Sequence, residues 1–361
     1  MKKIALTFVA VLVLIGAVIV YDTTETSEIG YPGVGMQTTD SVSNLEEKIA
    51  YNEIPIAIPM PPAAGAKAGE IYKNVQVLGH LPAAQFSRLM VSITAWVAPK
   101  QGCVYCHNIN NLASDEKYQK VVSRRMLQMT QHINEDWQSH VEQTGVTCYT
   151  CHRGNNVPEY IWFDTPPEPN RMVGGGMATQ NRASENTGSS SLPGNPFSTF
   201  LVNDDHNIRV QSAGQIFPSN RNRSSIKQTE WTYGLMMHFS NSLGINCTGC
   251  HNSRSWNDWS QSPERRATAW QGIRMVRDLN SHWLIPLQPI YPEYRLGVMG
   301  DAPKVNCMTC HQGAYKPLLG QSMLKDFPSL SRAYAPSAEL ELELEVEPEP
   351  MPTKASTDEE G

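Results

Sequence analysis

Apolar positions recur with a helical period in four stretches of the chain. From Ala83 to Val97 they fall three or four residues apart and share one face of a helix. The same pattern predicts helices from Ser114 to Glu142, near Glu230 to Leu243 and near Pro263 to Trp283. Between them the chain has no sustained period. We therefore expect a mainly α-helical fold with extensive irregular coil.

The N-terminus has a different pattern, in which Lys2 and Lys3 precede 18 apolar positions from Ile4 to Tyr21. This run is at the short end of what spans a bilayer. A cleaved secretory signal is the competing interpretation, but no small-residue cleavage site such as Ala-x-Ala ends the run. We expect residues 1–21 to be a retained transmembrane helix. The lysines would stay cytoplasmic, and the rest of the chain would be exported.

All eight cysteines belong to four copies of Cys-x-x-Cys-His. The cysteines are Cys103, Cys106, Cys148, Cys151, Cys247, Cys250, Cys307 and Cys310, and the histidines that follow are His107, His152, His251 and His311. Disulfides or zinc sites use Cys-x-x-Cys too, but neither requires the following histidine. The pattern indicates four covalently attached c-type haems. Each cysteine pair would bind the porphyrin, and each histidine would be the proximal iron ligand.

The sixth position on each iron decides what such a protein does, because a haem with an open face activates small molecules. Apolar helix faces before the motifs offer Met90 for the first haem, Met126 (or Met129) for the second and Met236 (or Met237) for the third. For the fourth haem both Met275 and His140 are candidates. The remaining histidines are expected to be ordinary surface or core residues; they are His80, His132, His206, His238 and His282.

Each pair of motifs follows the same order of helices, which predicts an internal duplication of a two-haem unit. Trp137 has a counterpart in Trp283, and Arg125-Met126 resembles Arg274-Met275. The expected segments are an extended arm, a first half, a flexible connector, a second half and an acidic disordered tail. They span residues 22–70, 71–170, 171–205, 206–336 and 337–361.

The net charge of −6 is concentrated in the tail. From Ala338 to Gly361 there are nine acidic residues and one lysine, so the rest of the chain carries +2. The acidity therefore says little about the folded surface. We expect no nucleic-acid partner.

Several local sequences add to the motifs. They are Tyr72-Lys-Asn-Val-Gln-Val-Leu78, Phe86-Ser-Arg-Leu-Met90 with Trp96-Val-Ala-Pro99, and Ala269-Trp with Gly272-Ile-Arg-Met-Val-Arg-Asp-Leu279. With them, residues 71–330 closely resemble the tetrahaem cytochrome subunit of purple-bacterial photosynthetic reaction centres. Many members of that family carry an N-terminal lipoprotein cysteine, which this chain lacks.

The resemblance implies four axial pairs, and it favours His140 over Met275. The pairs are Met90 with His107, Met126 with His152, Met236 with His251, and His140 with His311. It also implies that Arg266 adjoins a haem, and that the haems form a row with the third nearest the bacteriochlorophyll special pair.

The function implied is electron transfer, without enzyme activity, from a soluble periplasmic donor to the photo-oxidised special pair. The donor would be a small cytochrome c or an iron–sulfur protein. The L and M subunits, the H subunit and the light-harvesting ring would be partners on the periplasmic side of the inner membrane. Two other classes compete: a multihaem periplasmic oxidoreductase with a substrate-binding haem, and a surface protein stapled by disulfides.

Overall fold

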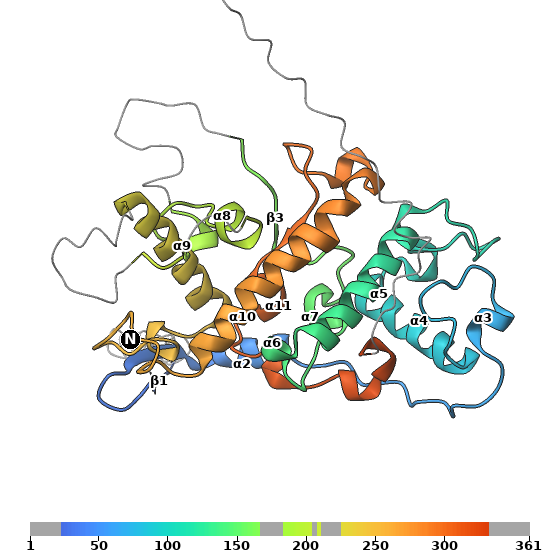
Figure 1. Cartoon of the computed structure of the whole chain (residues 1–361). Coiled ribbons are helices and arrows are strands. Elements are labelled where there is room, and N and C mark those ends of the chain that lie inside the picture. Colours follow the sequence, from blue (N-terminus) through green and yellow to red (C-terminus); the bar gives the residue numbers. More distant parts are fainter. Residues whose placement is uncertain (1–22, 167–182, 204–207, 211–224, 332–361) are drawn as a thin grey trace, which may run out of the picture.

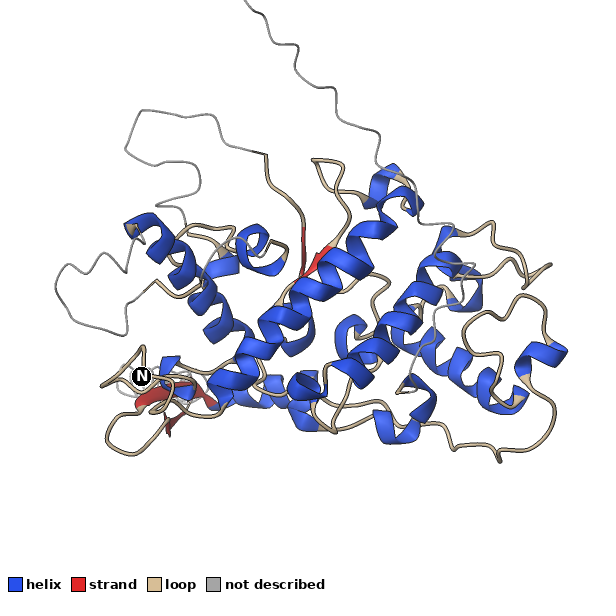
Figure 2. Ribbon diagram, in the orientation of Figure 1, coloured by secondary structure: helices blue, strands red, loops and turns tan. Residues whose placement is uncertain are grey.

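Helices joined by long coil segments make up the computed structural model, which describes residues 23–166, 183–203, 208–210 and 225–331 (Figures 1 and 2). The anchor predicted at 1–21, the tail predicted at 337–361 and residues 171–182 of the predicted connector lie outside these ranges. Within the ranges, no helix is both long and apolar enough to cross a bilayer.

The α-helices are α2 (Val42–Tyr51), α3 (Ala68–Ile71), α4 (Ala83–Val97), α5 (Tyr118–Asp136), α6 (Gln138–Val141), α7 (Cys148–His152), α8 (Phe197–Leu201), α9 (Ile226–Leu243), α10 (Arg265–Asp278) and α11 (Cys307–His311). Shorter or irregular helical turns are η1 (Gly102–Tyr105), η2 (Glu185–Thr187), η3 (Cys247–Gly249), η4 (Leu279–Leu284), η5 (Ile285–Ile290), η6 (Glu293–Arg295), η7 (Pro317–Gly320), η8 (Leu324–Asp326) and η9 (Pro328–Leu330). Antiparallel pairs are formed by β1 (Thr24–Ile29) with β2 (Met36–Ser41), and by β3 (Ile161–Trp162) with β4 (Lys304–Val305).

The four predicted helices are present, with differences at their ends. Helix α4 has the predicted bounds, and α9 begins four residues before its predicted start. The helix expected from 114 to 142 begins instead at Tyr118 and is interrupted at Trp137, whose ψ of 28° separates α5 from α6. Helix α10 ends as an α-helix at Asp278 and continues as the π-helix η4. Pro286 lies two residues beyond η4 and cannot donate a backbone hydrogen bond to extend it.

The segment expected to be an extended arm packs against both halves of the chain; the carbonyls of Ile58 and Pro61, for example, accept hydrogen bonds from α4. Its first part is the β1–β2 hairpin, which lies over the third Cys-x-x-Cys-His motif (Figure 1). The Thr248 hydroxyl of that motif donates to the Ile29 carbonyl and accepts the Met36 N–H at 2.9 Å. Asn246 also donates to the Met36 carbonyl at 2.9 Å. Sequence periodicity missed the hairpin because both faces of its strands are mostly polar and exposed.

Two hydrophobic clusters form the cores. The first core contains Leu78, Leu81, Leu89, Trp96, Leu127, Leu318, Met323, Phe327 and Leu330. The second core contains Ile133, Trp162, Phe197, Phe200, Leu201, Leu235, Ile273, Met275, Val276, Leu279 and Trp283. Phe197 and Leu201 are fully buried, so this part of the segment predicted to be a flexible connector is packed core.

Candidate haem-binding centres

The four Cys-x-x-Cys-His motifs adopt two backbone forms. The second and fourth motifs are the short helices α7 and α11, which begin after Thr147 and Asn306. Both helices end in a left-handed residue, Arg153 with φ 46° and Gln312 with φ 49°. The first and third motifs instead form the 3-10 turns η1 and η3. Each form brings two thiols and one imidazole onto a single turn of backbone.

The eight cysteines form no disulfide bonds with one another. Burial raises the pKa of Cys148 and of Cys307 to about 12 and that of Cys106 to about 11. A hydrogen bond to Cys310, together with burial, raises the pKa of Cys151. That contact brings the second and fourth motifs side by side. Pairs of cysteines three positions apart, with no disulfide among them, fit covalent attachment to a porphyrin.

The histidine of each motif uses one ring nitrogen to hold its orientation. Nδ1 faces a backbone carbonyl oxygen in every case: His107 with Leu112 at 3.1 Å, His152 with Asn155 at 2.9 Å, His251 with Trp256 at 2.9 Å and His311 with Ala314 at 3.0 Å. A carbonyl can only accept, so Nδ1 carries the proton and Nε2 presents its lone pair. This is the second-sphere arrangement typical of metal-bound histidine.

Burial keeps three of these imidazoles neutral. It lowers the pKa of His311 to about 4 and also lowers the pKa values of His152 and His251. A neutral imidazole is the form that binds a metal, because protonation would occupy the lone pair. The environment of these rings therefore fits iron ligation at neutral pH.

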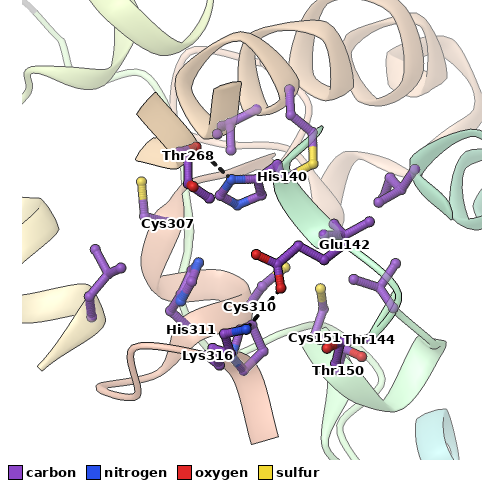
Figure 3. Close-up of a pocket in the computed structure, with 18 of the residues that line it drawn as sticks. His140, Glu142, Thr144, Thr150, Cys151, Thr268, Cys307, Cys310, His311 and Lys316 are labelled. Atoms are coloured by element: carbon purple, nitrogen blue, oxygen red, sulfur yellow. Dashed lines mark hydrogen bonds and ion pairs between the residues drawn. The ribbon is translucent and has the colours of Figure 1, made fainter. Parts of the chain in front are cut away.

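His140 lies across a cavity from His311, although 171 positions separate them in the chain (Figure 3). Their ring centres are 6.1 Å apart. Two imidazoles that bind one metal from opposite sides through bonds of about 2 Å have ring centres about 6 Å apart. His140 is also oriented like the motif histidines, since its Nδ1 donates to the Thr268 carbonyl at 2.9 Å. This is the predicted axial pair that consists of two imidazoles, and their ring planes are inclined to each other at 67°.

The cavity between these two histidines has room for a large planar group. It contains about 1350 Å³ of space between its atoms, part of it open to solvent, and Cys307 and Cys310 line it. Cys151 and Cys250 of the neighbouring motifs also line it. The thiols of Cys307 and Cys310, the two opposed imidazoles and the apolar walls fit a c-type haem.

The three predicted methionine ligands lie partly buried on helices beside the cores. Met90 is on α4, which packs against η1, and Met236 is on α9 beside the second core. The carbonyl of Met90 accepts a hydrogen bond from Thr94 at 2.8 Å, and that of Met126 accepts one from Thr130 at 2.8 Å. Met90 and Met126 thus share a local setting.

The rival residues have other surroundings. Met237 packs toward Gly188, at which a β-carbon would lie 3.7 Å from Met237 Cε. Met129 packs against the second core. Met275 is buried in that core and also lines the cavity beside His140.

Arg266, predicted to adjoin a haem, lies next to the third motif. Its guanidinium stacks on Trp259 at 4.2 Å and donates to Ser262 at 2.8 Å. Burial, followed by repulsion from Arg209, lowers its pKa. Its neighbour Arg265 was missed by sequence reasoning; it stacks on Tyr315 at 4.6 Å and lines the cavity of the fourth motif. Two arginines therefore flank adjacent motifs.

The fold and these centres define a c-type cytochrome, a protein that binds haem covalently through Cys-x-x-Cys-His. Residues 21–331 match the family model for the photosynthetic reaction centre cytochrome C subunit. The chain belongs to this family. It is therefore an electron-transfer component of a photosynthetic reaction centre and not an enzyme.

Curated relatives carry the same description, photosynthetic reaction center cytochrome c subunit. The protein from Rubrivivax gelatinosus is 51% identical over 310 residues, which are 86% of this chain and 84% of the relative. That from Thermochromatium tepidum is 47% identical over 305 residues, 84% and 74% of the two chains. That from Roseobacter denitrificans is 43% identical over 329 residues, 88% of each chain.

Proposed function

We propose that this chain carries four c-type haems and passes electrons from a soluble periplasmic carrier to the photo-oxidised special pair of its reaction centre. The haems supply redox-active iron, and the chain supplies ligands, orientation and exclusion of water. One observation carries the proposal. Four Cys-x-x-Cys-His segments each hold their histidine by Nδ1, with Nε2 left to bind iron.

Each proposed haem has two protein ligands. The axial pairs are Met90 with His107, Met126 with His152, Met236 with His251, and His140 with His311. The facing of His140 and His311 supports the last pair directly. Iron with two protein ligands mainly passes electrons, which argues against an oxidoreductase that binds substrate at an open haem. His/Met ligation raises the reduction potential of a haem relative to His/His ligation. By its ligands alone, the fourth haem would therefore have a lower potential than the other three.

Recurring hydrogen bonds support the proposed duplication. Gly154, two residues after His152, donates to the Trp96 carbonyl at 2.8 Å. Gly313, two residues after the fourth motif histidine, donates to the Ser242 carbonyl at the same 2.8 Å. Ser242 follows Trp96 by 146 positions. The first helix of each proposed half thus meets the second motif of that half in the same way.

The same spacing favours one of two adjacent methionines as the third haem's ligand. Met236 follows Met90 by 146 positions, whereas Met237 follows it by 147. The preceding residues, Leu89 and Leu235, are both buried, as expected for equivalent core positions. This register supports Met236.

Membership of the family supports a proposal for the partners and the location. We propose docking on the L and M subunits at the periplasmic face of the photosynthetic membrane, in a complex that includes the H subunit and the light-harvesting ring. Residues 1–21 would anchor the chain, and Arg266 would adjoin the third haem. A small cytochrome c or an iron–sulfur protein would be the soluble donor.

Flash excitation of native membranes tests the function. Oxidation of this cytochrome within each flash, followed by re-reduction on addition of a soluble donor, is expected. A pyridine haemochrome assay should give about four haems per chain, as the four motifs predict. Absence of light-driven haem oxidation, or a count well below four, would contradict the proposal.

A further inference from the structure

A second pair of hydrogen-bonded residues extends the register between the two halves. The side chain of Asn134 accepts the Val146 N–H at 2.7 Å and donates to the Val146 carbonyl at 2.9 Å. Asn280 makes the same two bonds with Val305, at 2.8 and 2.9 Å. Val146 and Val305 each lie two residues before the first cysteine of a motif. Asn280 follows Asn134 by 146 positions.

This register pairs Met126 with Gly272, which follows it by 146 positions. The resemblance of Arg125-Met126 to Arg274-Met275 is three residues out of register, because Met275 follows Met126 by 149. Trp283, in contrast, follows Trp137 by 146 and agrees with the hydrogen bonds. The position that provides the proposed methionine ligand of the second haem therefore has no side chain in the second half.

The imidazole of His140 occupies the space beside Gly272. A β-carbon at Gly272 would lie 2.6 Å from Cε1, 3.0 Å from Nδ1 and 3.2 Å from Nε2 of His140, and these are the three atoms nearest to it. Glycine inside a helix costs about 1 kcal/mol relative to alanine. Its presence in the buried middle of α10 is explained by this close approach, since the backbone there is ordinary helix.

The backbone of α10 also orients the ring. Thr268 lies one helical turn before Gly272, and its carbonyl accepts the Nδ1 proton of His140 at 2.9 Å. The unsubstituted position and this carbonyl form a recess, which we define by Thr268 and Gly272. The recess directs Nε2 of His140 toward the cavity that His311 faces (Figure 3).

We propose that Gly272 is a positioning residue that assigns histidine, in place of methionine, to the distal side of the fourth haem. Because position 272 is glycine, the methionine ligand that the duplication would place there is absent. The same glycine leaves open the recess that His140, from the first half, enters. This inference rests on the proposed axial ligation and extends it. Its physical consequence is that one haem of the row has His/His ligation while its counterpart in the first half has His/Met ligation.

The test uses holoprotein with Gly272→Ala or Gly272→Met, with Arg274→Ala as the control on the exposed face of the same helix. Electron paramagnetic resonance of the oxidised protein separates His/His from His/Met haems, and ferric His/Met haem has its own charge-transfer band. Wild type and the control should show one His/His and three His/Met haems. Gly272→Ala should lose the His/His signal, and Gly272→Met should replace it with a fourth His/Met signal and raise one midpoint potential.

Either single variant could fail to assemble, so each is also made with His140→Ala. If contact with His140 is the reason for glycine, the double variant Gly272→Ala, His140→Ala will assemble where Gly272→Ala does not. An unchanged His/His signal in Gly272→Ala overturns the inference, as does equal failure of single and double variants. A wild type without any His/His haem would instead overturn the proposed ligation itself.

Discussion

Nε2 of His132 lies 2.6 Å from a carboxylate oxygen of Asp278, and Asp278 follows His132 by the same 146 positions that separate Asn134 from Asn280. In the proposed duplication, these two residues occupy one equivalent position and contact each other. The contact joins α5 to the end of α10. It would thus lie on the axis that relates the two halves.

Further ion pairs, hydrogen bonds and ring contacts surround His132 and Asp278. Nδ1 of His132 lies 2.6 Å from Asp136, and His282 lies 2.8 Å from Asp278. Trp137 donates to Asp278 at 2.9 Å. The second tryptophan, Trp283, stacks on His132 with ring centres 5.0 Å apart and carries the guanidinium of Arg125 on its ring at 4.0 Å. The sequence analysis treated both histidines as ordinary residues.

Removing the charge of His132 should destabilise the protein in a pH-dependent way. The hydrogen bond to Asp278 raises the pKa of His132, so its stabilisation is complete below the unfolded-state pKa of about 6.5 and is lost as pH rises through the higher folded-state value. Burial opposes the effect at Asp278, but hydrogen bonds from His132 and Trp137 lower its pKa to about 2. The pair should therefore contribute most between about pH 4 and pH 6.5.

Denaturant unfolding of His132→Asn, followed by tryptophan fluorescence, should show a loss of about 1 to 2 kcal/mol at pH 6 and a smaller loss at pH 9. His282→Asn is the matched control, because that side chain is 74% exposed and should cost under about 0.5 kcal/mol. An equal loss at both pH values would contradict the role given to the charge.

His140→Ala should leave the fourth haem without a distal ligand. One quarter of the iron is then expected to become high-spin, measured by electron paramagnetic resonance of the oxidised holoprotein. His132→Ala, in the adjoining helix, is the control and should keep all haems low-spin. Unchanged spin state in His140→Ala would exclude this residue as a ligand.

Met236→Leu and Met237→Leu should differ sharply despite their adjacency. Loss of Met236 should reduce the charge-transfer band of methionine-ligated haem by about one third, because three haems are proposed to have such a ligand. Loss of Met237, which packs toward Gly188, should leave the band unchanged. The reverse result would assign the third haem to Met237.

Thr248→Val should loosen the N-terminal hairpin from the third motif. The hydroxyl joins Ile29 and Met36, and loss of such a partly buried hydrogen-bonding group costs about 1 to 3 kcal/mol. Amide hydrogen exchange in residues 24–41 should become faster. Thr39→Val removes only an exposed hydroxyl contact with Thr26 at 2.9 Å and should leave the exchange near the wild-type rate.

The periodicity of the sequence predicted α4 with its observed bounds. A helix that buries one face against a core has apolar residues three or four positions apart, which form a regular stripe. The periodicity failed at Trp137, where the chain turns between α5 and α6 so that His140 can leave the line of α5. It also failed at the β1–β2 hairpin, whose stability comes from hydrogen bonds to Asn246 and Thr248, more than 200 positions away.

The cysteines and histidines proposed to hold the haems could be predicted from sequence alone, because one turn of backbone brings each set together. The distal ligands could only be candidates there, since a side chain reaches iron through packing between helices distant in the chain. His140 opposite His311 is such a case, and the resemblance to a family favoured it while spacing left Met275 open. The tertiary structure supports the proposed ligand through a carbonyl at Thr268 and a missing side chain at Gly272, neither of which carries a local signal in the sequence.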